Sequence, residues 1–285
     1  MINSPIVDAH LHIWEPSRSN VRYSWLQNVP KLNRDFSLAD YNEACGPVKV
    51  ESMVFIQCDA DHADYQKEAD WAEEQATTDP RIRGIVPTAP LEKGDGVKPI
   101  LERMASNPRI KGIRRLIQSE EDVEFCLRPD FVRGVQLLPS FDLSFDICIF
   151  NPQTANAIKM VAQCPEVRFI LDHVGKPDIK NQVLDPWKDQ MKTLAGFENV
   201  HCKMSGLVNE AVWGNWAPAD LKPYIEYVIE CFGFDRLVYG GDWPVCLLSS
   251  TVRRWFDTLS DALSDYAEDE LMKLFHDNAI TFYRL

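Results

Sequence analysis

Short apolar runs typical of β-strands recur along the chain and alternate with stretches in which apolar residues follow a helical spacing. Eight such runs lie at residues 6–10, 53–57, 84–88, 110–116, 145–150, 168–172, 200–204 and 237–239. Consecutive runs are separated by enough residues for a crossover helix, which is the pattern of parallel β/α units. Eight such units predict an α/β protein in which residues 1–285 form a single (β/α)8 TIM barrel domain.

The helical stretches carry start and stop signals of their own. Between Pro218 and Gly233 apolar residues recur about every 3.6 positions, so one face of this helix is expected to be buried. Asn151 is placed to cap a second helix, which should end before Pro165. A doubly wound open sheet is the alternative fold, but the Gly-x-Gly-x-x-Gly loop that usually follows its first strand is absent here.

Polar residues directly follow several of the predicted strands, where a (β/α)8 barrel gathers its chemistry. The candidates at these positions are His10, His12, Arg114, His173 and Asp242. His10 and His12 are two residues apart in an extended segment, so their side chains leave the backbone on the same side. Two neutral imidazoles placed in this way can begin a zinc-type site or donate hydrogen bonds to a bound carbonyl. An ordinary exposed pair is the alternative, because His-x-His alone is a weak motif.

Composition and charge narrow the classes of function. The chain has 285 residues, of which 45% are hydrophobic, enough for a large core, and its formal net charge of -13 opposes binding to nucleic acid. The N-terminal sequence has no signal-peptide pattern and no apolar stretch could span a bilayer, so we expect a cytoplasmic protein without membrane contact. Its 8 cysteines form no Cys-x-x-Cys pair and are expected to stay reduced. Formation of a homo-oligomer stays open.

Most of the tryptophans lie in the segments that follow predicted strands. Trp25 and Trp213 are candidates for stacking on a ring-shaped substrate, because an indole offers a flat apolar face with a polar edge. Packing of long loops is the alternative role for both. Trp25 also lies in the long segment 15–40, which has room to fold over the barrel mouth as a lid.

Taken together, these residues lie in motifs that resemble the amidohydrolase superfamily, most closely its sugar-lactonase branch. The motifs are DAHLHIW at 8–14, YSWL at 23–26, KGIRR at 111–115, LDHVGKP at 171–177, KMSGL at 203–207, YGGDWPV at 239–245 and NAITFY at 278–283. The resemblance implies an amidohydrolase-type barrel that hydrolyses the lactone ring of a sugar acid, such as L-fucono- or L-rhamnonolactone. Relatives of this branch act on 2-pyrone-4,6-dicarboxylate. A lactone isomerase or a decarboxylase of the same superfamily is the alternative function, and a non-catalytic binding barrel is a third.

The resemblance also bears on the cofactor. Some members of the superfamily hold two metal ions through a lysine after the fourth strand and a histidine after the fifth. This chain departs from that pattern, because Lys111 lies at the wrong end of its run and Asn151 follows the fifth run. The resemblance therefore implies one divalent ion or none, with zinc the first choice. The candidate ligands are His10, His12 and Asp242, with His173 either a further ligand or a hydrogen-bond donor to the substrate. Relatives that work without metal keep metal-free catalysis open.

A mechanism follows from these assignments. Hydrolysis of an ester needs a polarised carbonyl, an activated water and a group that accepts the proton of that water. Asp242 is the candidate base, and its position between Gly241 and Trp243 is expected to raise its basicity. His10 and His12 would polarise the carbonyl or hold the water, and His173 would stabilise the oxyanion or help to protonate the leaving alkoxide.

Two basic residues are further candidates for contact with the substrate. Arg114 and Arg115 point to opposite sides of an extended run, so at most one faces the barrel mouth, and the resemblance favours Arg114. Its planar fork suits a ring oxygen or a carboxylate, whereas a structural ion pair is the alternative. Lys203 precedes the Met-Ser-Gly turn and is either a substrate ligand or part of a surface ion pair.

Overall fold

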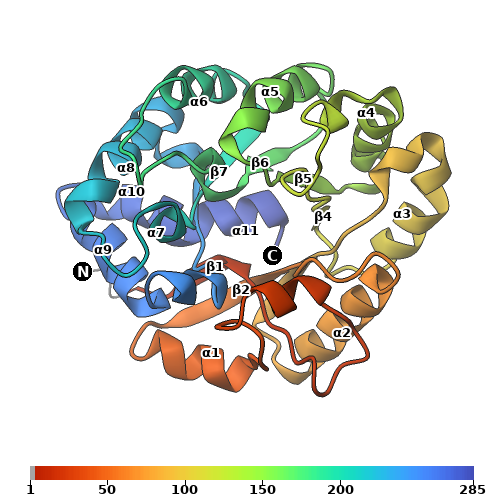
Figure 1. The fold of residues 1–285 in the computed structure, drawn as a ribbon, viewed down its shortest axis with the longest axis horizontal. Helices are drawn as coiled ribbons and strands as arrows, with labels where there is room; N and C mark the ends of the chain where they lie inside the picture. Colours follow the sequence, from red (N-terminus) through yellow and green to blue (C-terminus); the bar gives the residue numbers. More distant parts are fainter. Residues whose placement is uncertain (1–3) are drawn as a thin grey trace.

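The structure is a computed structural model that describes residues 4–285, and its centre is a ring of eight parallel strands surrounded by helices (Figure 1). The strands are β1 (Ile6–Leu11), β2 (Val50–Ile56), β3 (Ile82–Val86), β4 (Gly112–Ile113), β5 (Ser144–Ile147), β6 (Phe169–Leu171), β7 (Val200–Met204) and β8 (Leu237–Tyr239). They pair in the orders β1-β2-β3 and β4-β5-β6-β7-β8. Single parallel bridges, Ile85 with Ile110 and Leu11 with Trp243, join these two groups on both sides. The predicted (β/α)8 barrel is confirmed.

The helices fill the connections between strands and the C-terminal end. They are α1 (Leu38–Cys45), α2 (Tyr65–Thr78), α3 (Lys98–Ala105), α4 (Pro129–Gln136), α5 (Thr154–Ala162), α6 (Trp187–Ala195), α7 (Leu207–Glu210), α8 (Pro218–Phe232), α9 (Val252–Ala262), α10 (Glu268–Met272) and α11 (Asn278–Tyr283). The helix predicted between Pro218 and Gly233 is confirmed, and Gly233 ends it with a φ of 62°. None of the helices between residues 4 and 285 has the length and apolarity needed to cross a membrane.

Two local predictions were wrong. Asn151 does not cap a helix; a 3-10 turn (Asn151–Gln153) precedes α5, and the side-chain oxygen of Gln153 accepts the backbone N–H of Phe150. The predicted strand at 110–116 is only two residues long in β4. Regular pairing with β5 ends at Ile113, although the backbone N–H of Arg114 still donates to the carbonyl of Pro87, the residue after β3.

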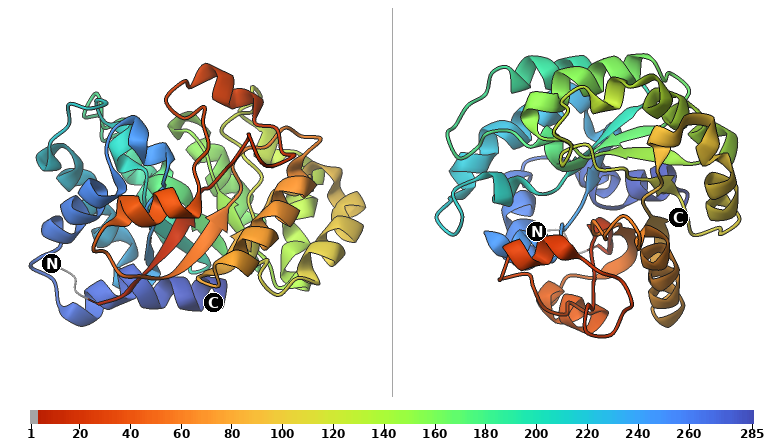
Figure 2. Two further views of the ribbon diagram at one scale, coloured as in Figure 1. Left: turned by 90° about the horizontal axis from the view of Figure 1, so that it is seen from below. Right: turned by 45° about the vertical axis from the view of Figure 1, so that its right-hand side comes forward.

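Apolar side chains fill the ring at one end of the strands, and the last helix covers that end. The inward-facing cluster consists of Val7, Ala9, Val54, Ile56, Val86, Ile170 and Val238, packed against Ala279, Phe282 and Tyr283 of α11. Figure 2 shows α11 lying across one end of the strands, in blue. Burial of this cluster is driven by the hydrophobic effect and leaves only the other end of the ring for polar groups.

The segment 15–40 lies at the end of the barrel opposite to α11, in red in Figure 2. It contains one 3-10 helix (Ser24–Asn28) and the start of α1. An antiparallel bridge between Trp14 and Phe36 ties its two ends together. The indole of Trp25 donates to the carbonyl of Cys58, 2.9 Å away, which anchors the loop to the segment after β2. Its predicted role as a lid stays a prediction.

Candidate active site

A β-bulge in β1 aims both histidines into the barrel. Val7 and Ala9 belong to the inward-facing apolar cluster, so strict alternation would turn His10 and His12 outward. The pairing of β1 with β2 shifts in register between Asp8 and Leu11, which changes the alternation at this point. Both imidazoles are therefore buried at the polar end of the ring.

The end of β8 meets β1 at this bulge and brings Asp242 beside the histidines. The backbone N–H of Asp242 donates to the carbonyl of His10, and that of His12 donates to the carbonyl of Trp243, both at 2.8 Å. The contact is close enough to require glycine, because a Cβ at Gly240 would lie 2.6 Å from the Cβ of His10. Asp8 completes the junction by accepting the N–H groups of His10 and Gly241.

Three side-chain atoms converge at this junction. Nε2 of His10 and Nε2 of His12 are 3.1 Å apart, and Oδ1 of Asp242 lies 3.8 Å and 3.6 Å from them. The carbonyl of Ile56 lies 2.8 Å from Nδ1 of His12 and accepts a hydrogen bond from the N–H at that position. The lone pair of His12 is thereby left on Nε2, facing the other two groups.

These atoms fit a divalent ion of the zinc type. Their separations leave a point about 2 Å from all three, which matches the usual zinc–nitrogen and zinc–oxygen distances of about 2.0–2.2 Å. A second group of His10, Asp172 and His173 also has donor atoms within 4.8 Å of one another. Both groups depend on His10, which favours one ion over two.

His173 follows β6 and stands beside His10, with 4.5 Å between the ring centroids. Its Nδ1 is 2.9 Å from the hydroxyl of Ser205. The backbone of His173 is left-handed, with a φ of 54°, and that of Asp242 has a φ of 53°. Non-glycine residues adopt this region rarely and at an energetic cost, and such residues cluster at functional sites.

A buried network of charges lies between the histidines and the apolar floor. The ammonium of Lys203 contacts Asp146 at 2.6 Å, Asp172 at 3.0 Å and Nδ1 of His10 at 3.2 Å. Arg114 donates to Asp172 at 3.1 Å and to the carbonyl of Gln57 at 2.6 Å. Burying charges is costly unless they are paired, so these side chains are held in place by one another. The paired charges therefore fix the orientation of His10 from the side of the apolar cluster.

Burial sets the protonation of the imidazoles. It lowers the pKa of His10 and of His12, and the pKa of His173 falls to about 4. All three are neutral at neutral pH, which is the form that binds metal ions and donates one hydrogen bond.

The predicted rise in the basicity of Asp242 was wrong. Burial alone would raise the pKa of its carboxyl, but the interactions with His173, His12 and Lys176 outweigh burial and lower that pKa. Asp242 is therefore fully ionised at neutral pH. Its second oxygen accepts the side-chain N–H of Asn209 at 3.3 Å.

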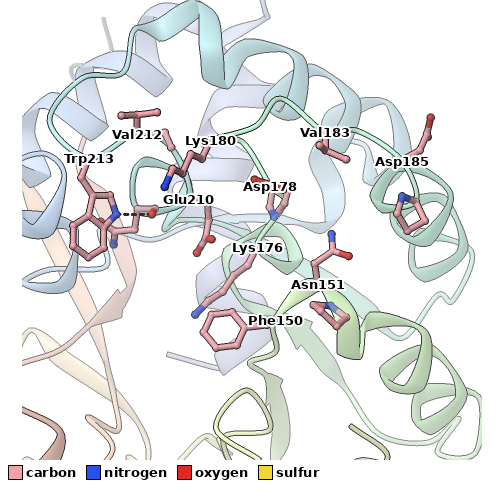
Figure 3. A pocket seen from close by; sticks show the side chains of 15 residues that line it. Phe150, Asn151, Lys176, Asp178, Lys180, Val183, Asp185, Glu210, Val212 and Trp213 are labelled. Carbon is pink, nitrogen blue, oxygen red and sulfur yellow. Dashed lines mark hydrogen bonds between the residues drawn. The ribbon is translucent and has the colours of Figure 1, made fainter. Parts of the chain in front are cut away.

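A pocket of about 910 Å³ opens next to these residues (Figure 3). We call it the side pocket; its lining comes from residues 150–152, from positions between 176 and 186, and from 209–213, which follow β5, β6 and β7. Asn209 lines the pocket and also bonds Asp242, so the pocket borders the carboxylate. Lys176 projects towards the ring of Phe150, 4.7 Å from its centroid.

The architecture and these residues agree with a known family. A family model described as Amidohydrolase matches residues 7–285. The chain belongs to this family. The L-fucono-1,5-lactonase of Burkholderia ambifaria is 27% identical over 288 residues, which cover 98% of this chain and 95% of that protein. The L-rhamnono-gamma-lactonase of Scheffersomyces stipitis is 24% identical over 336 residues, 98% of each chain.

A solved structure is similar along the whole chain. An amidohydrolase from Burkholderia multivorans, with bound zinc, superposes with a TM-score of 0.88 and 27% sequence identity, covering 99% of this chain and 100% of that one. The similarity therefore extends along nearly the whole chain.

In the present protein, four of the predicted site residues lie in one cluster: His10, His12, His173 and Asp242. Arg114 borders the cluster, with one guanidinium nitrogen 3.4 Å from Nε2 of His10. Arg115 points the other way and pairs with Glu92 and Glu120. The two side chains therefore lie on opposite sides of the run, as expected, and Arg114 makes the structural ion pair with Asp172, while its contact with substrate stays a prediction.

Of the three other predicted residues, Lys203 contacts His10 from within the barrel, and no hydrogen bond or ring contact joins the two tryptophans to the cluster's side chains among the residues from 4 to 285. The alternative of a surface ion pair for Lys203 was wrong, because its side chain is completely buried and its ion pairs lie inside the barrel. Trp25 is half-buried against Trp14 and Cys58. Trp213 is 58% exposed and lines the side pocket of this amidohydrolase, where its indole donates to the carbonyl of Asn209.

Reasoning from the sequence missed four residues that shape the site. Asp146 and Asp172 pair with Lys203, Tyr283 donates to Asp146 at 2.7 Å, and Asn209 bonds Asp242. A usable signal existed for Asp146, because it is a lone charge inside an otherwise apolar strand. Tyr283 and Asn209 carry no comparable local signal.

Proposed function

We propose that this amidohydrolase hydrolyses the lactone ring of a sugar acid to the open-chain acid. The observation that carries the proposal is the ionised carboxylate of Asp242 within 3.8 Å of two neutral imidazole nitrogens. A base beside groups that can hold a water or polarise a carbonyl is what ester hydrolysis needs. The similarity to L-fucono-1,5-lactonase and L-rhamnono-gamma-lactonase supports a small sugar lactone as the substrate.

In the proposed mechanism Asp242 takes the proton of the attacking water. Its lowered pKa keeps it ionised, and its bond to Asn209 leaves Oδ1 facing the histidines. Attack on the lactone carbonyl forms a tetrahedral oxyanion, and breaking the ring C–O bond then releases an alkoxide that needs a proton. The proton that Asp242 has accepted can be returned to this oxygen, so the proton balance closes.

In this proposal His173 stabilises the oxyanion by a hydrogen bond. With Nδ1 facing Ser205, its other ring nitrogen is left for the substrate, and a neutral imidazole can donate one hydrogen bond there. Arg114 adds positive charge beside His10 and is proposed to orient the substrate. Lys203 is proposed as a positioning residue for His10, since it is buried and pairs with Asp172, the carboxylate beside Nδ1 of that ring.

His10, His12 and Asp242 are the residues that would hold a divalent ion, with zinc proposed. Polarisation of a carbonyl and easier deprotonation of water are the chemistry that such an ion supplies when bound. Asp172 lies 3.5 Å from Nδ1 of His10, where a carboxylate can accept that proton and leave Nε2 as the ligand atom.

Other expectations about this protein stay predictions. They are the organisation as a single domain, the lid role of residues 15–40, the substrate contacts of Trp25 and Trp213, the cytoplasmic location and the absence of nucleic-acid and membrane partners.

The test is a proton-release assay with stereoisomeric aldonolactones, run on enzyme as purified and after treatment with a chelator. We expect hydrolysis of at least one sugar lactone, and elemental analysis should find no more than one divalent ion per chain. Release of carbon dioxide from an acid substrate, or a change of ring size without acid release, would replace the proposal by a decarboxylase or an isomerase. Two tightly bound ions would contradict the ligand assignment.

A further inference from the structure

The side pocket collects most of the exposed apolar side chains of the protein. Six large hydrophobic residues are exposed in the described part of the chain, and four of them line this pocket: Phe150, Val183, Val212 and Trp213. Single exposed apolar residues are common, but a contiguous group around a concavity marks a binding surface. The grouping therefore indicates that a ligand covers this wall.

The pocket is large for a single sugar lactone. A hexonolactone has about 12 non-hydrogen atoms, fewer than the drug-sized ligands that occupy pockets of roughly 300–1,000 Å³. The side pocket measures about 910 Å³, and the catalytic side chains themselves are not part of its wall. Asp242 is only 3% exposed, and Asn209 of the pocket wall donates a hydrogen bond to its carboxylate. A lactone at Asp242 would leave most of this volume to another part of the same molecule.

Polar groups without partners stand among the apolar ones. The carboxylate of Glu210 and the ammonium of Lys180 both line the pocket. Lys176 attracts the Glu210 carboxylate, but no hydrogen bond or ion pair joins either group to another residue between 4 and 285. In Figure 3 the side chain of Glu210 extends into the space between Lys176 and Trp213. Aromatic faces beside free carboxylate and ammonium groups suit a sugar ring, which has apolar C–H faces and hydroxyl edges.

We propose that the side pocket is a binding subsite for a second sugar ring, so that the preferred substrate is the lactone of a disaccharide acid. This inference rests on the proposed lactonase function. Phe150 and Trp213 would cover the faces of the second ring, and Glu210 would accept its hydroxyl protons. Binding energy from this ring is available in the ground state and the transition state alike, so it lowers KM more than it raises kcat.

The experiment compares D-glucono-1,5-lactone with the 1,5-lactones of cellobionic, maltobionic and lactobionic acids, with a panel of other single-ring aldonolactones alongside. We expect kcat/KM for at least one two-ring lactone to exceed that for gluconolactone at least tenfold, mainly through KM. Phe150→Ala should reduce this ratio to below about threefold. Tyr266→Ala is the matched control, because Tyr266 is also an exposed aromatic residue but lies outside the pocket.

The outcomes separate the two proposals. If no lactone of either length is hydrolysed, the proposed function fails. If single-ring lactones are hydrolysed and no two-ring lactone surpasses gluconolactone, the function stands and the second-ring subsite is overturned. Light scattering on the same variants provides a further check: a change of oligomeric state in Phe150→Ala but not in Tyr266→Ala would make this wall a contact between copies of the chain and would also overturn the subsite.

Discussion

Buried carboxyl groups in this protein differ in charge because their neighbours differ. Asp242 faces three imidazole or ammonium groups, which keep its pKa below the ordinary value in spite of burial. Glu68 of α2 is just as buried, but its main partner is the backbone N–H of Cys58, and burial raises its pKa to about 7. The nearest groups, and not burial alone, decide which acid is ionised at neutral pH.

The first prediction concerns Asp242. Asp242→Asn is nearly isosteric but cannot accept a proton, so we expect kcat to fall by roughly 10²–10⁴, the usual effect of losing a general base, with an unchanged melting temperature. Steady-state kinetics and thermal unfolding measure both. If the residue is only a metal ligand, added zinc should restore part of the activity; if it is the base, added zinc should have no effect. A lower melting temperature with normal activity per folded molecule would make Asp242 structural.

The second prediction is a pH dependence of stability due to Glu68. Its folded-state pKa of about 7 lies above the ordinary 4.5, so the native state binds the extra proton and the free energy of unfolding should fall as pH rises between these values. The shift corresponds to about 3 kcal/mol in full. Urea unfolding at pH 5 and pH 8 should show that Glu68→Gln loses this fall, whereas the exposed Glu74→Gln keeps it. An identical pH profile in both variants would contradict the assignment.

At the scale of elements, the junction of β1 with β8 both closes the barrel and builds the site. The bulge in β1 turns His10 and His12 inward, and the backbone bonds from Asp242 and His12 across the junction set their spacing. Asp8 accepts hydrogen bonds from backbone N–H groups on both sides of this junction and from the hydroxyl of Tyr41 in α1. Errors in strand pairing at this one place would therefore displace the whole set of candidate ligands.

The third prediction tests this junction. In Gly240→Ala the new Cβ would lie 2.6 Å from the Cβ of His10, so β8 must move away from β1. We expect a loss of about 1–3 kcal/mol in unfolding free energy, as for other overpacked positions, and at least a tenfold loss of kcat/KM. Gly96→Ala is the control, since the nearest heavy atom to its Cβ is 3.7 Å away. Normal kinetics in Gly240→Ala would show that the site tolerates a wider junction.

On the scale of the whole molecule, the C-terminal helix and the catalytic end are linked through the barrel interior. Tyr283 of α11 donates to Asp146, Asp146 pairs with Lys203, and Lys203 contacts His10. This chain of contacts crosses the barrel from its closed end to its polar end. The last helix therefore supports the site as well as covering the apolar core.

The fourth prediction follows from this arrangement. Tyr283→Phe keeps the ring but removes the bond to Asp146, so a buried acceptor loses a partner and the free energy of unfolding should fall by about 1–3 kcal/mol. Chemical denaturation measures the change. Tyr266→Phe serves as the comparison, because that side chain is exposed and should change stability by less than about 0.5 kcal/mol. Equal effects in the two variants would mean that the bond to Asp146 contributes nothing.

The sequence alone determined the strand pattern and the positions at which chemistry could occur. Each β-run is a local apolar pattern, and His10, His12, His173 and Asp242 are recognisable because each follows such a run. Local patterns suffice for these features, since a strand end is defined by residues that are neighbours in the chain.

Only the tertiary structure decided how these residues meet. The bulge in β1 depends on pairing with β2. The lowered pKa of Asp242 depends on imidazoles that follow two other strands. The hydrogen bond to Asp146 comes from Tyr283, 137 positions away in the chain. Alternation within one strand predicted that both histidines leave the backbone on the same side, but only the change of register in β1 turns that side into the barrel. Such features arise from distances in space between residues that are far apart in the chain, and no local pattern contains those distances.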